Sequence, residues 1–306
     1  MELTKDFLKA KRPCADGFRW FIRNRPSNTD YQHLLDALVA EGRVGDACWL
    51  LDQFGPVDTV RVLDTIDADA VVFAGSLQVR RGIDVDTVVR AGGSIRAGGG
   101  LRAGRAVACG ADLRVDGQVW CGGTLETGGA LRAGWGVEVG ETLRCGGDLR
   151  ASWSLSAGGA VSVDGGITVG YDLLVHGRLD CGHGLRAGGG VAADDAVRVG
   201  RGIVAGGTLR AGGHLEAGWG IRADGSIVVD GAIRAGEGIE SGEEIRAGDG
   251  YGVYAGLAVR RDAWEISAPV RARARPAGLT SGWWAGEPMD RRTPPGIFAT
   301  DRAVRT

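Results

Sequence analysis

The feature that most constrains this chain is an aliphatic residue that recurs every six residues from Val71 to Leu257, at 31 of 32 positions, with Tyr251 at the remaining one. One run shows the spacing plainly: Leu209, Leu215, Ile221, Ile227, Ile233, Ile239 and Ile245. A period of six places successive aliphatic residues on opposite sides of a helix, so it excludes an amphipathic helix. Six residues are also too few for the two strands and turn of a hairpin. The spacing therefore predicts a parallel β-solenoid in which each hexad supplies one strand and one corner.

The pattern within each hexad predicts the direction of each side chain. The aliphatic residue and the small residue two positions later face inward together, because alternate residues of a strand point the same way. The residue between them faces outward. The fourth position is glycine in 20 hexads and aspartate in 6, which we interpret as corners with turned, left-handed backbone. Three faces per coil give 18 residues per coil and about 10–11 coils over residues 69–262, with no insertion in any hexad.

Composition excludes several other classes of protein. Collagen does not fit, because glycine does not recur every third residue and there are only 8 prolines beside 55 glycines. A formal net charge of -2 argues against a nucleic-acid or membrane-surface partner. No stretch approaches 18 consecutive apolar residues, so we expect no membrane span. The first residues lack the apolar segment of a secretory signal, which predicts a cytoplasmic protein.

Residues 1–68 have an ordinary composition and predict a small unit of two or three helices. Apolar residues recur at helical spacing from Tyr31 to Val39, and a second group runs from Ala47 to Phe54. One interpretation is a cap over the open end of the solenoid, which repeat proteins need for solubility. The other is a docking unit for a partner protein that presents His33 or Trp20.

Residues 263–306 leave the hexad register. Trp264, Ile266, Ala268 and Val270 alternate at a period of two. The alternation predicts one or two strands that fold over the last coil as a cap. From Glu287 onward the prolines indicate an irregular tail.

The repeat resembles two known groups of proteins. Phased as Ala217-Gly218-Trp219-Gly220-Ile221-Arg222, it is similar to the hexapeptide repeat of left-handed solenoid acyltransferases. That resemblance implies a trimeric acyl or nucleotidyl transferase with a histidine base. The region also resembles bactofilin, a bacterial polymer-forming cytoskeletal protein with a right-handed triangular β-helix, which implies a scaffold. A further likeness, to bacterial glycine-rich proteins with GWGI-AG-type repeats behind a helical start, implies no activity.

Candidates for catalysis are few. Only three histidines lie in the repeat region, namely His176, His183 and His214, and we expect them to be solvated corner residues. Four cysteines occupy the small inward position, at Cys109, Cys121, Cys145 and Cys181. Inward thiols two coils apart are too distant for a disulfide or a shared metal, so we expect reduced core residues. The sequence thus predicts no catalytic set, no metal and no cofactor.

One outward column is unusual in its charge. At 18 residues per coil, Arg96, Arg114, Arg132 and Arg150 stack vertically, with Arg186 and Arg222 further along. An aromatic column at 18-residue spacing borders it: Trp135, Trp153 and Tyr171. One interpretation is a strip that binds an anionic polymer, an acidic partner or a second copy. The other is a solvated face balanced by acidic residues on neighbouring columns, such as Glu126, Glu138 and Asp148.

These observations predict a non-enzymatic structural scaffold, a self-assembling or interaction protein that presents a rigid rod. The expected partner is a second copy of the chain or another protein. Two alternatives remain open from the sequence: a trimeric hexapeptide-type transferase, and a binder of an anionic ligand through the Arg and Trp strip.

Overall fold

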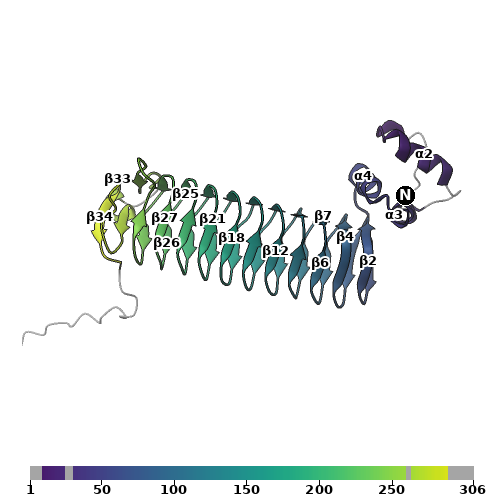
Figure 1. Ribbon diagram of the computed structural model, residues 1–306, viewed down its shortest axis with the longest axis horizontal. Helices are drawn as coiled ribbons and strands as arrows, with labels where there is room; N and C mark the ends of the chain where they lie inside the picture. The colour runs from purple at the N-terminus through teal and green to yellow at the C-terminus, as the bar shows by residue number, and fades with distance from the viewer. Residues whose placement is uncertain (1–8, 25–29, 260–262, 289–306) are drawn as a thin grey trace, which may run out of the picture.

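The computed structural model describes residues 9–24, 30–259 and 263–288. A long rod of short strands carries a few helices at its N-terminal end (Figure 1). Within the described residues, no helix is long and apolar enough to span a membrane. The described chain ends at the far end of the rod, opposite the helices (Figure 1).

The strands stack into three faces. The basic face, named for its arginines, holds β1 (Val60–Leu63), β3 (Ser76–Val79), β5 (Ile95–Ala97), β8 (Leu113–Val115), β11 (Leu131–Ala133), β14 (Leu149–Ala151), β17 (Ile167–Val169), β20 (Leu185–Ala187), β23 (Ile203–Ala205), β26 (Ile221–Ala223), β29 (Ile239–Ser241), β32 (Pro269–Arg271) and β34 (Trp283–Gly286). Two longer strands, β2 (Ile66–Phe73) and β4 (Ile83–Ala91), turn the corner between the other two faces.

The second face, called the paired face for its ion pairs, holds β7 (Ala106–Cys109), β10 (Thr124–Thr127), β13 (Leu143–Cys145), β16 (Val161–Val163), β19 (Leu179–Cys181), β22 (Val197–Val199), β25 (Leu215–Ala217), β28 (Ile233–Ala235), β31 (Val253–Tyr254) and β33 (Leu279–Ser281). The third face holds β6 (Leu101–Ala103), β9 (Val119–Cys121), β12 (Val137–Val139), β15 (Leu155–Ala157), β18 (Leu173–Val175), β21 (Val191–Ala193), β24 (Leu209–Ala211), β27 (Ile227–Val229) and β30 (Ile245–Arg246).

The register confirms the predicted three-sided parallel β-solenoid. From β5 to β30, each strand pairs in parallel with the strand 18 residues away, as Leu131 does with Leu113 and Leu149. The solenoid has about 12 turns, more than the expected 10–11, because strands are added at both ends of the hexad region. Thirteen strands on the basic face leave twelve spacings of about 4.8 Å, so the rod is about 58 Å long.

The interior follows the predicted alternation. In a typical strand such as β11, Leu131 and Ala133 are buried and Arg132 between them is exposed. The aliphatic and small residues of the hexads form one continuous apolar column from Ile66 to Ala272. Because each layer packs only on the layers before and after it, the core is a stack of similar layers, one for each coil.

The corners differ from the prediction in their backbone. None of the described glycines with positive φ is a regular corner glycine of the hexads; Gly250, near the break in the repeat, has φ +78. Glycine is needed for another reason. A Cβ built on Gly134 would lie 2.1 Å from the carbonyl oxygen of Asp116, one coil earlier. The fourth position is therefore glycine because stacked coils approach closely there, and the expectation of left-handed backbone was wrong.

The hexad register also ends earlier than predicted. After Ile245 the chain gains two residues, so Val253 pairs with Ile233 in the position expected for Tyr251. The turn residue Gly250 supplies the extra length, with φ +78. Tyr251 and Leu257, both predicted to point inward, are 50% and 53% exposed.

The predicted strand beginning at Trp264 is another correction. Trp264–Ser267 forms the short helix α5, and the strand β32 starts only at Pro269. Ile266 is 71% exposed, so the period-two alternation has no buried side to stabilise a strand there. The strands β32, β33 and β34 then extend the basic and paired faces, and Trp284 packs against the end of the core. Of the irregular tail expected from Glu287 onward, residues 289–306 lie outside the described residues.

The helical unit consists of α2 (Ala15–Asn24), α3 (Tyr31–Ala40) and α4 (Val44–Phe54). Its apolar core packs against Val72 and Ala74 of the first coil. The Gln32 amide on α3 pairs with that coil like a strand: Nε2 donates to the carbonyl of Val72 at 3.0 Å, and Oε1 accepts from the amide of Ala74 at 2.8 Å. Of the two residues that the docking interpretation presents, Trp20 is only 8% exposed and its Nε1 donates to Glu41, whereas His33 is exposed.

Candidate functional site: a row of arginines beside an aromatic corner

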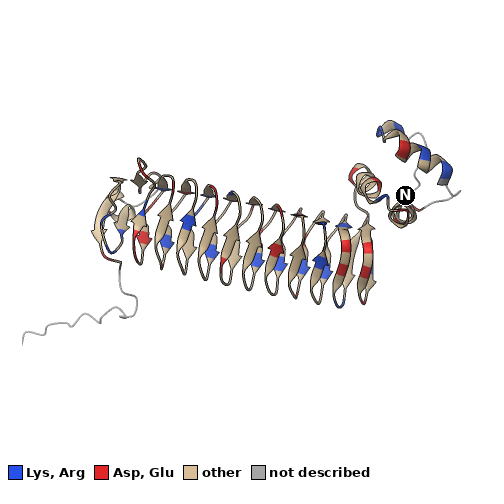
Figure 2. Ribbon diagram, viewed as in Figure 1, with Lys and Arg blue, Asp and Glu red and all other residues tan. Residues whose placement is uncertain are grey.

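The basic face carries an unbroken row of four arginines. Arg96, Arg114, Arg132 and Arg150 lie at the outward position of β5, β8, β11 and β14, and each is in register with the next. Neighbouring strands are about 4.8 Å apart, so the row is about 14 Å long. Thr168 interrupts it, and Arg186 follows on β20. The structure therefore brings the four predicted arginines together (Figure 2 shows the charges along the rod).

The ion pairs of this row run sideways: each joins an arginine to an aspartate of the same coil, and none of those in the described part of the chain joins one coil to the next. The Arg114 Nε lies 3.4 Å from Oδ1 of Asp116, and the Arg150 Nη2 lies 3.7 Å from Oδ2 of Asp148. Within the described residues, Arg96 and Arg132 form no ion pair. The sideways pairs involve side chains that are about half exposed, so water screens them and each contributes at most about 1 kcal/mol.

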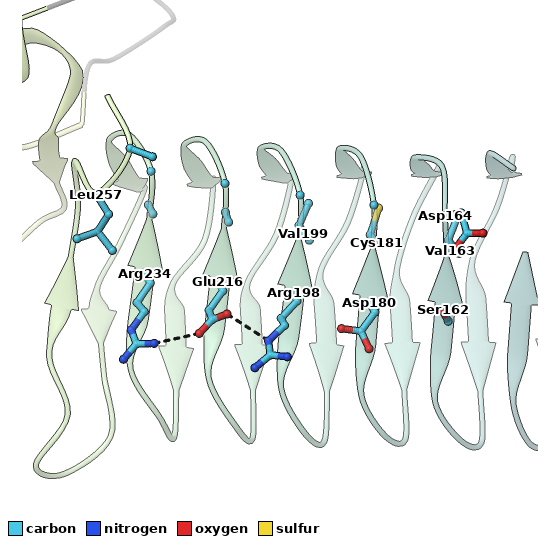
Figure 3. A pocket seen from close by; sticks show the side chains of 17 residues that line it. Ser162, Val163, Asp164, Asp180, Cys181, Arg198, Val199, Glu216, Arg234 and Leu257 are labelled. Carbon is cyan, nitrogen blue, oxygen red and sulfur yellow. Dashed lines mark hydrogen bonds and ion pairs between the residues drawn. The ribbon is translucent and has the colours of Figure 1, made fainter. Parts of the chain in front are cut away.

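On the paired face, opposite charges on neighbouring strands neutralise one another within the chain. On adjacent strands, Glu216 accepts from Arg198 and from Arg234, each at 3.1 Å (Figure 3). These three side chains line a groove of about 700 Å³, which ends at Leu257 (Figure 3). Opposite charges directly across neighbouring strands stabilise a sheet, whereas like charges destabilise it. The row of the basic face thus departs from the arrangement that the paired face adopts.

The predicted aromatic column forms the corner between the basic and third faces. The amide of Trp153 donates to the carbonyl of Trp135, and that of Tyr171 to the carbonyl of Trp153, which places the three on consecutive coils. The rings of Trp153 and Tyr171 are in contact, with centroids 4.1 Å apart. All three remain open to solvent, at 68% for Trp135, 55% for Trp153 and 50% for Tyr171. Large rings exposed in a group mark a contact surface more often than scattered ones.

The acidic residues that were expected to balance the row are mostly elsewhere. Glu126 lies on the paired face and Glu138 on the third face. Only Asp148 is near the row. The role of Asp116 was not predicted from the sequence. Its place two residues after Arg114 was a usable signal, because the corner brings the aspartate back beside the arginine. The cation–π contacts of Arg102 with Trp120 and of Arg201 with Trp219 were not predicted either.

The three histidines of the rod lie at separate corners, where His176 and His183 are exposed as expected and His214 is half-buried. His176 Nδ1 lies 2.9 Å from Oδ2 of Asp194, but the two side chains are 52% and 65% exposed. His214 Nδ1 accepts the amide of Ala232 at 3.0 Å, and His183 is exposed at another corner. Among the described residues, no group of three or more His, Cys, Asp or Glu side chains is arranged to hold a metal ion.

The four inward cysteines are buried and free. Each thiol donates to a carbonyl of a neighbouring corner, as Cys109 does to Ala111 at 3.2 Å and Cys145 to Gly129 at 3.3 Å. Burial raises the pKa of the Cys109 thiol from 9.0 to about 12. Burial likewise raises the pKa of Cys121 and Cys181. The thiols of Cys109, Cys121 and Cys181 therefore stay protonated, and all four cysteines act as small core residues that also satisfy buried carbonyl groups.

Comparison with known proteins touches only the N-terminal end. Residues 1–54 match the YdhT N-terminal domain, a stretch that ends with α4, where the helical unit ends. No curated protein and no solved structure matches the chain.

Proposed function

We propose that this protein is a non-enzymatic scaffold whose rigid rod holds an acidic partner along the basic face. The observation that carries the proposal is the row from Arg96 to Arg150, in register and with no carboxylate between its members. The rod supplies a straight, fixed support, because every coil of the hexad region repeats the same backbone hydrogen bonds. A face of this kind suits a partner that lies along it.

The electrostatics of the row support an outside source of anions. Four guanidinium groups at strand spacing repel one another, because like charges directly opposite on a sheet are destabilising. The chain alternates Arg198, Glu216 and Arg234 on the paired face, so the fold permits neutralisation. The row instead keeps Arg96 and Arg132 without an ion pair among the described residues. Carboxylates of a partner would neutralise these two and stabilise the bound state.

The aromatic corner supports contact with a protein surface rather than a bare ion. Trp135 and Trp153 follow Arg132 and Arg150 on the same coils, Tyr171 lies on the next coil, and all three expose half or more of their side chains. Tryptophan, tyrosine and arginine are the residues enriched at the centres of protein interfaces. The partner is then an acidic protein surface, carried by a second copy of the chain or by another protein.

Paired charge reversals test this proposal. The double variant Arg114→Glu, Arg132→Glu changes the row, and Arg144→Glu, Arg210→Glu makes the same charge change on the other two faces. Sedimentation velocity would measure self-association over a range of protein concentration. Fluorescence anisotropy with labelled poly-glutamate would measure binding of an acidic chain.

The expected result is a salt-dependent association, in one assay or both, that falls at least tenfold in the row variant and stays near wild type in the control variant. If the two double variants behave alike, or if neither association occurs, the proposal is wrong. Circular dichroism of both variants would check that the rod remains folded.

A further inference from the structure

The N-terminal end of the basic face is an open strand edge. The strand β1 pairs only with β3, and its other side has no partner strand among the described residues. The helices cover a different part of this end, because Gln32 pairs with Val72 of β2 and with Ala74 just after it. On β1, Val60 and Val62 are 62% and 51% exposed. An exposed edge strand presents unpaired N–H and C=O groups that can pair with another strand.

The direction of these groups follows from the pairing with β3. The carbonyls of Thr59 and Leu63 accept from the amides of the next coil, at 2.8 and 2.9 Å. In a parallel pair, alternate residues bond to the same neighbouring strand. The amide and carbonyl of Val60 and of Val62, which lie between, therefore point to the free side of β1.

A cavity opens beside this edge, at the end of the core. It measures about 360 Å³ and lies between α3 and the first coil. Its apolar lining includes Val39, Leu63, Ile66, Phe73 and Leu77. The cavity exists because Arg61 takes the inward position in register with Leu77, where later coils carry an aliphatic residue. The first layer of the core is thus incomplete on the basic face.

A segment of the chain outside the described residues, 289–306, has the apolar residues and the charge that this end would bind. Residues 289–306 contain Ile297-Phe298 after Pro294-Pro295-Gly296, an apolar pair preceded by residues that favour extended backbone. The segment carries four arginines against two aspartates, so its side chains have a net charge of +2. The receiving end is acidic, since four aspartates are exposed there against Arg61 and Arg80, the latter paired with Asp64 at 2.9 Å: Asp36, Asp58, Asp64 and Asp67.

The geometry of the rod decides which copy can supply the segment. The described chain ends at Pro288, just after β34, and β34 is the last strand of the same face whose first strand is β1. The two ends are about 58 Å apart. Eighteen residues span at most about 59–65 Å when fully extended, which leaves no length to pair with β1 of the same chain. In a second copy placed end to end, the segment starts close to the open edge.

We propose that residues 296–300 of one copy add as a strand to β1 of the next copy, with the Phe298 side chain in the cavity. Main-chain hydrogen bonds to Val60 and Val62 would supply affinity, and the cavity would select the side chain. Ile297, on the opposite side of the added strand, would lie outward near Val62. Because this contact uses two different ends of the molecule, it does not close, and it joins rods into linear chains. The proposal does not depend on the row of arginines.

Three variants of the full chain and one control test the proposal by sedimentation velocity over a range of concentration. Deletion of residues 289–306 removes the added strand, and Phe298→Asp places a charge in the cavity. Val62→Pro removes one amide on the free side of β1, where proline leaves the pairing with β3 intact. Val62→Thr keeps that amide and serves as the matched control.

A synthetic peptide of residues 289–306 separates binding from folding defects. We expect the wild type and Val62→Thr to form linear oligomers, and the other three variants to remain monomers. The peptide should bind the deletion variant and bind at least tenfold more weakly when Val62→Pro is added. A wild type that stays monomeric, or a deletion variant that assembles like the wild type, would overturn the proposal. Loss of assembly here with binding retained at the arginine row leaves the proposed scaffold function intact.

Discussion

At the scale of single residues, close approach between coils decides which side chain a position accepts. Gly170 and Gly184 are both corner glycines, yet their surroundings differ. A Cβ on Gly170 would lie 2.0 Å from the carbonyl oxygen of Ser152, whereas a Cβ on Gly184 would have its nearest neighbour at 3.6 Å. The first distance requires the backbone to move, and the second is ordinary van der Waals contact.

We therefore expect opposite effects from the same substitution. Gly170→Ala should lower the free energy of unfolding by about 1–3 kcal/mol, because the coils must separate to admit the methyl group. Gly184→Ala should leave it unchanged or raise it by about 0.5 kcal/mol, because alanine restricts the unfolded chain. Urea unfolding followed by circular dichroism would measure both. Equal losses in the two variants would show that close approach is not the reason for glycine at position 170.

The buried thiol of Cys109 predicts a loss of stability at alkaline pH. Burial raises its pKa from 9.0 to about 12. Between these values the unfolded thiol ionises while the folded thiol keeps its proton. The free energy of unfolding should therefore fall as the pH rises from 9 to 12.

The variant Cys109→Ala isolates this contribution, because alanine already occupies the same inward position at Ala97 and Ala103. The pH dependence of unfolding should be shallower in the variant than in the wild type over that range. Tyr31, whose pKa burial raises to about 12, contributes equally to both proteins and cancels in the comparison. Parallel curves for the two proteins would contradict the assignment.

At the scale of elements, the junction between helix and rod depends on one side chain. Gln32 on α3 satisfies the carbonyl of Val72 and the amide of Ala74 at the same time. Val72 and Ala74 are buried beneath the helices, so these backbone groups have no access to water when Gln32 is removed. A buried amide left without a partner costs about 1–3 kcal/mol.

Gln32→Leu should therefore loosen the helical unit from the first coil. Hydrogen exchange at the Ala74 amide should become faster, while amides in the middle of the rod, such as Val137, keep their rates. Gln32→Glu is the matched control, because its carboxylate still accepts from Ala74 although it no longer donates to Val72. Unchanged exchange at Ala74 in Gln32→Leu would show that apolar packing alone holds the helices in place.

The elements also show where sequence reasoning succeeds and where it stops. The hexads predicted every strand from β5 to β30, because an inward aliphatic residue at fixed spacing leaves only one way to form a core. The prediction failed after Ile245, where Gly248-Asp249-Gly250 forms a turn and adds two residues. Gly248 and Gly250 resemble the glycines of a regular corner, so the sequence spacing alone did not reveal the two extra residues.

The same reasoning located the arginine row but not its contacts. The period of 18 placed Arg96 to Arg150 in one column, because register in a solenoid is set by sequence distance. Whether Arg114 pairs with Asp116 or with an acidic residue of the next coil depends on how the corner turns, which a repeat does not encode. The open edge at β1 was missed for a related reason: Val60 and Val62 precede the first full hexad.

At the scale of the whole molecule, the rod is a stack in which each coil contacts only its neighbours. Removal of residues 167–202 deletes two complete coils and joins Gly166 to Ile203, so the register of every face is preserved. We expect the shortened protein to fold, because stability in such stacks is approximately a sum over units and their interfaces. Its longest dimension should be about 10 Å smaller by small-angle X-ray scattering.

A matched deletion of residues 167–199 removes 33 residues and breaks the register. It should give an aggregated or partly unfolded protein, because inward residues are then placed at corners. If both deletions fold equally well, or if neither does, the coils are not the independent units that the pairing indicates.

The 18-residue register has a consequence for how such a chain can change over time. Gain or loss of a segment of this length alters the distance between the helical unit and the C-terminal strands by one strand spacing and leaves both ends as they were. Gains of other lengths disturb every layer that follows, unless a turn such as the one at Gly250 absorbs them. Duplication and loss of short gene segments can therefore adjust the reach of this molecule in fixed steps, independently of what its ends bind.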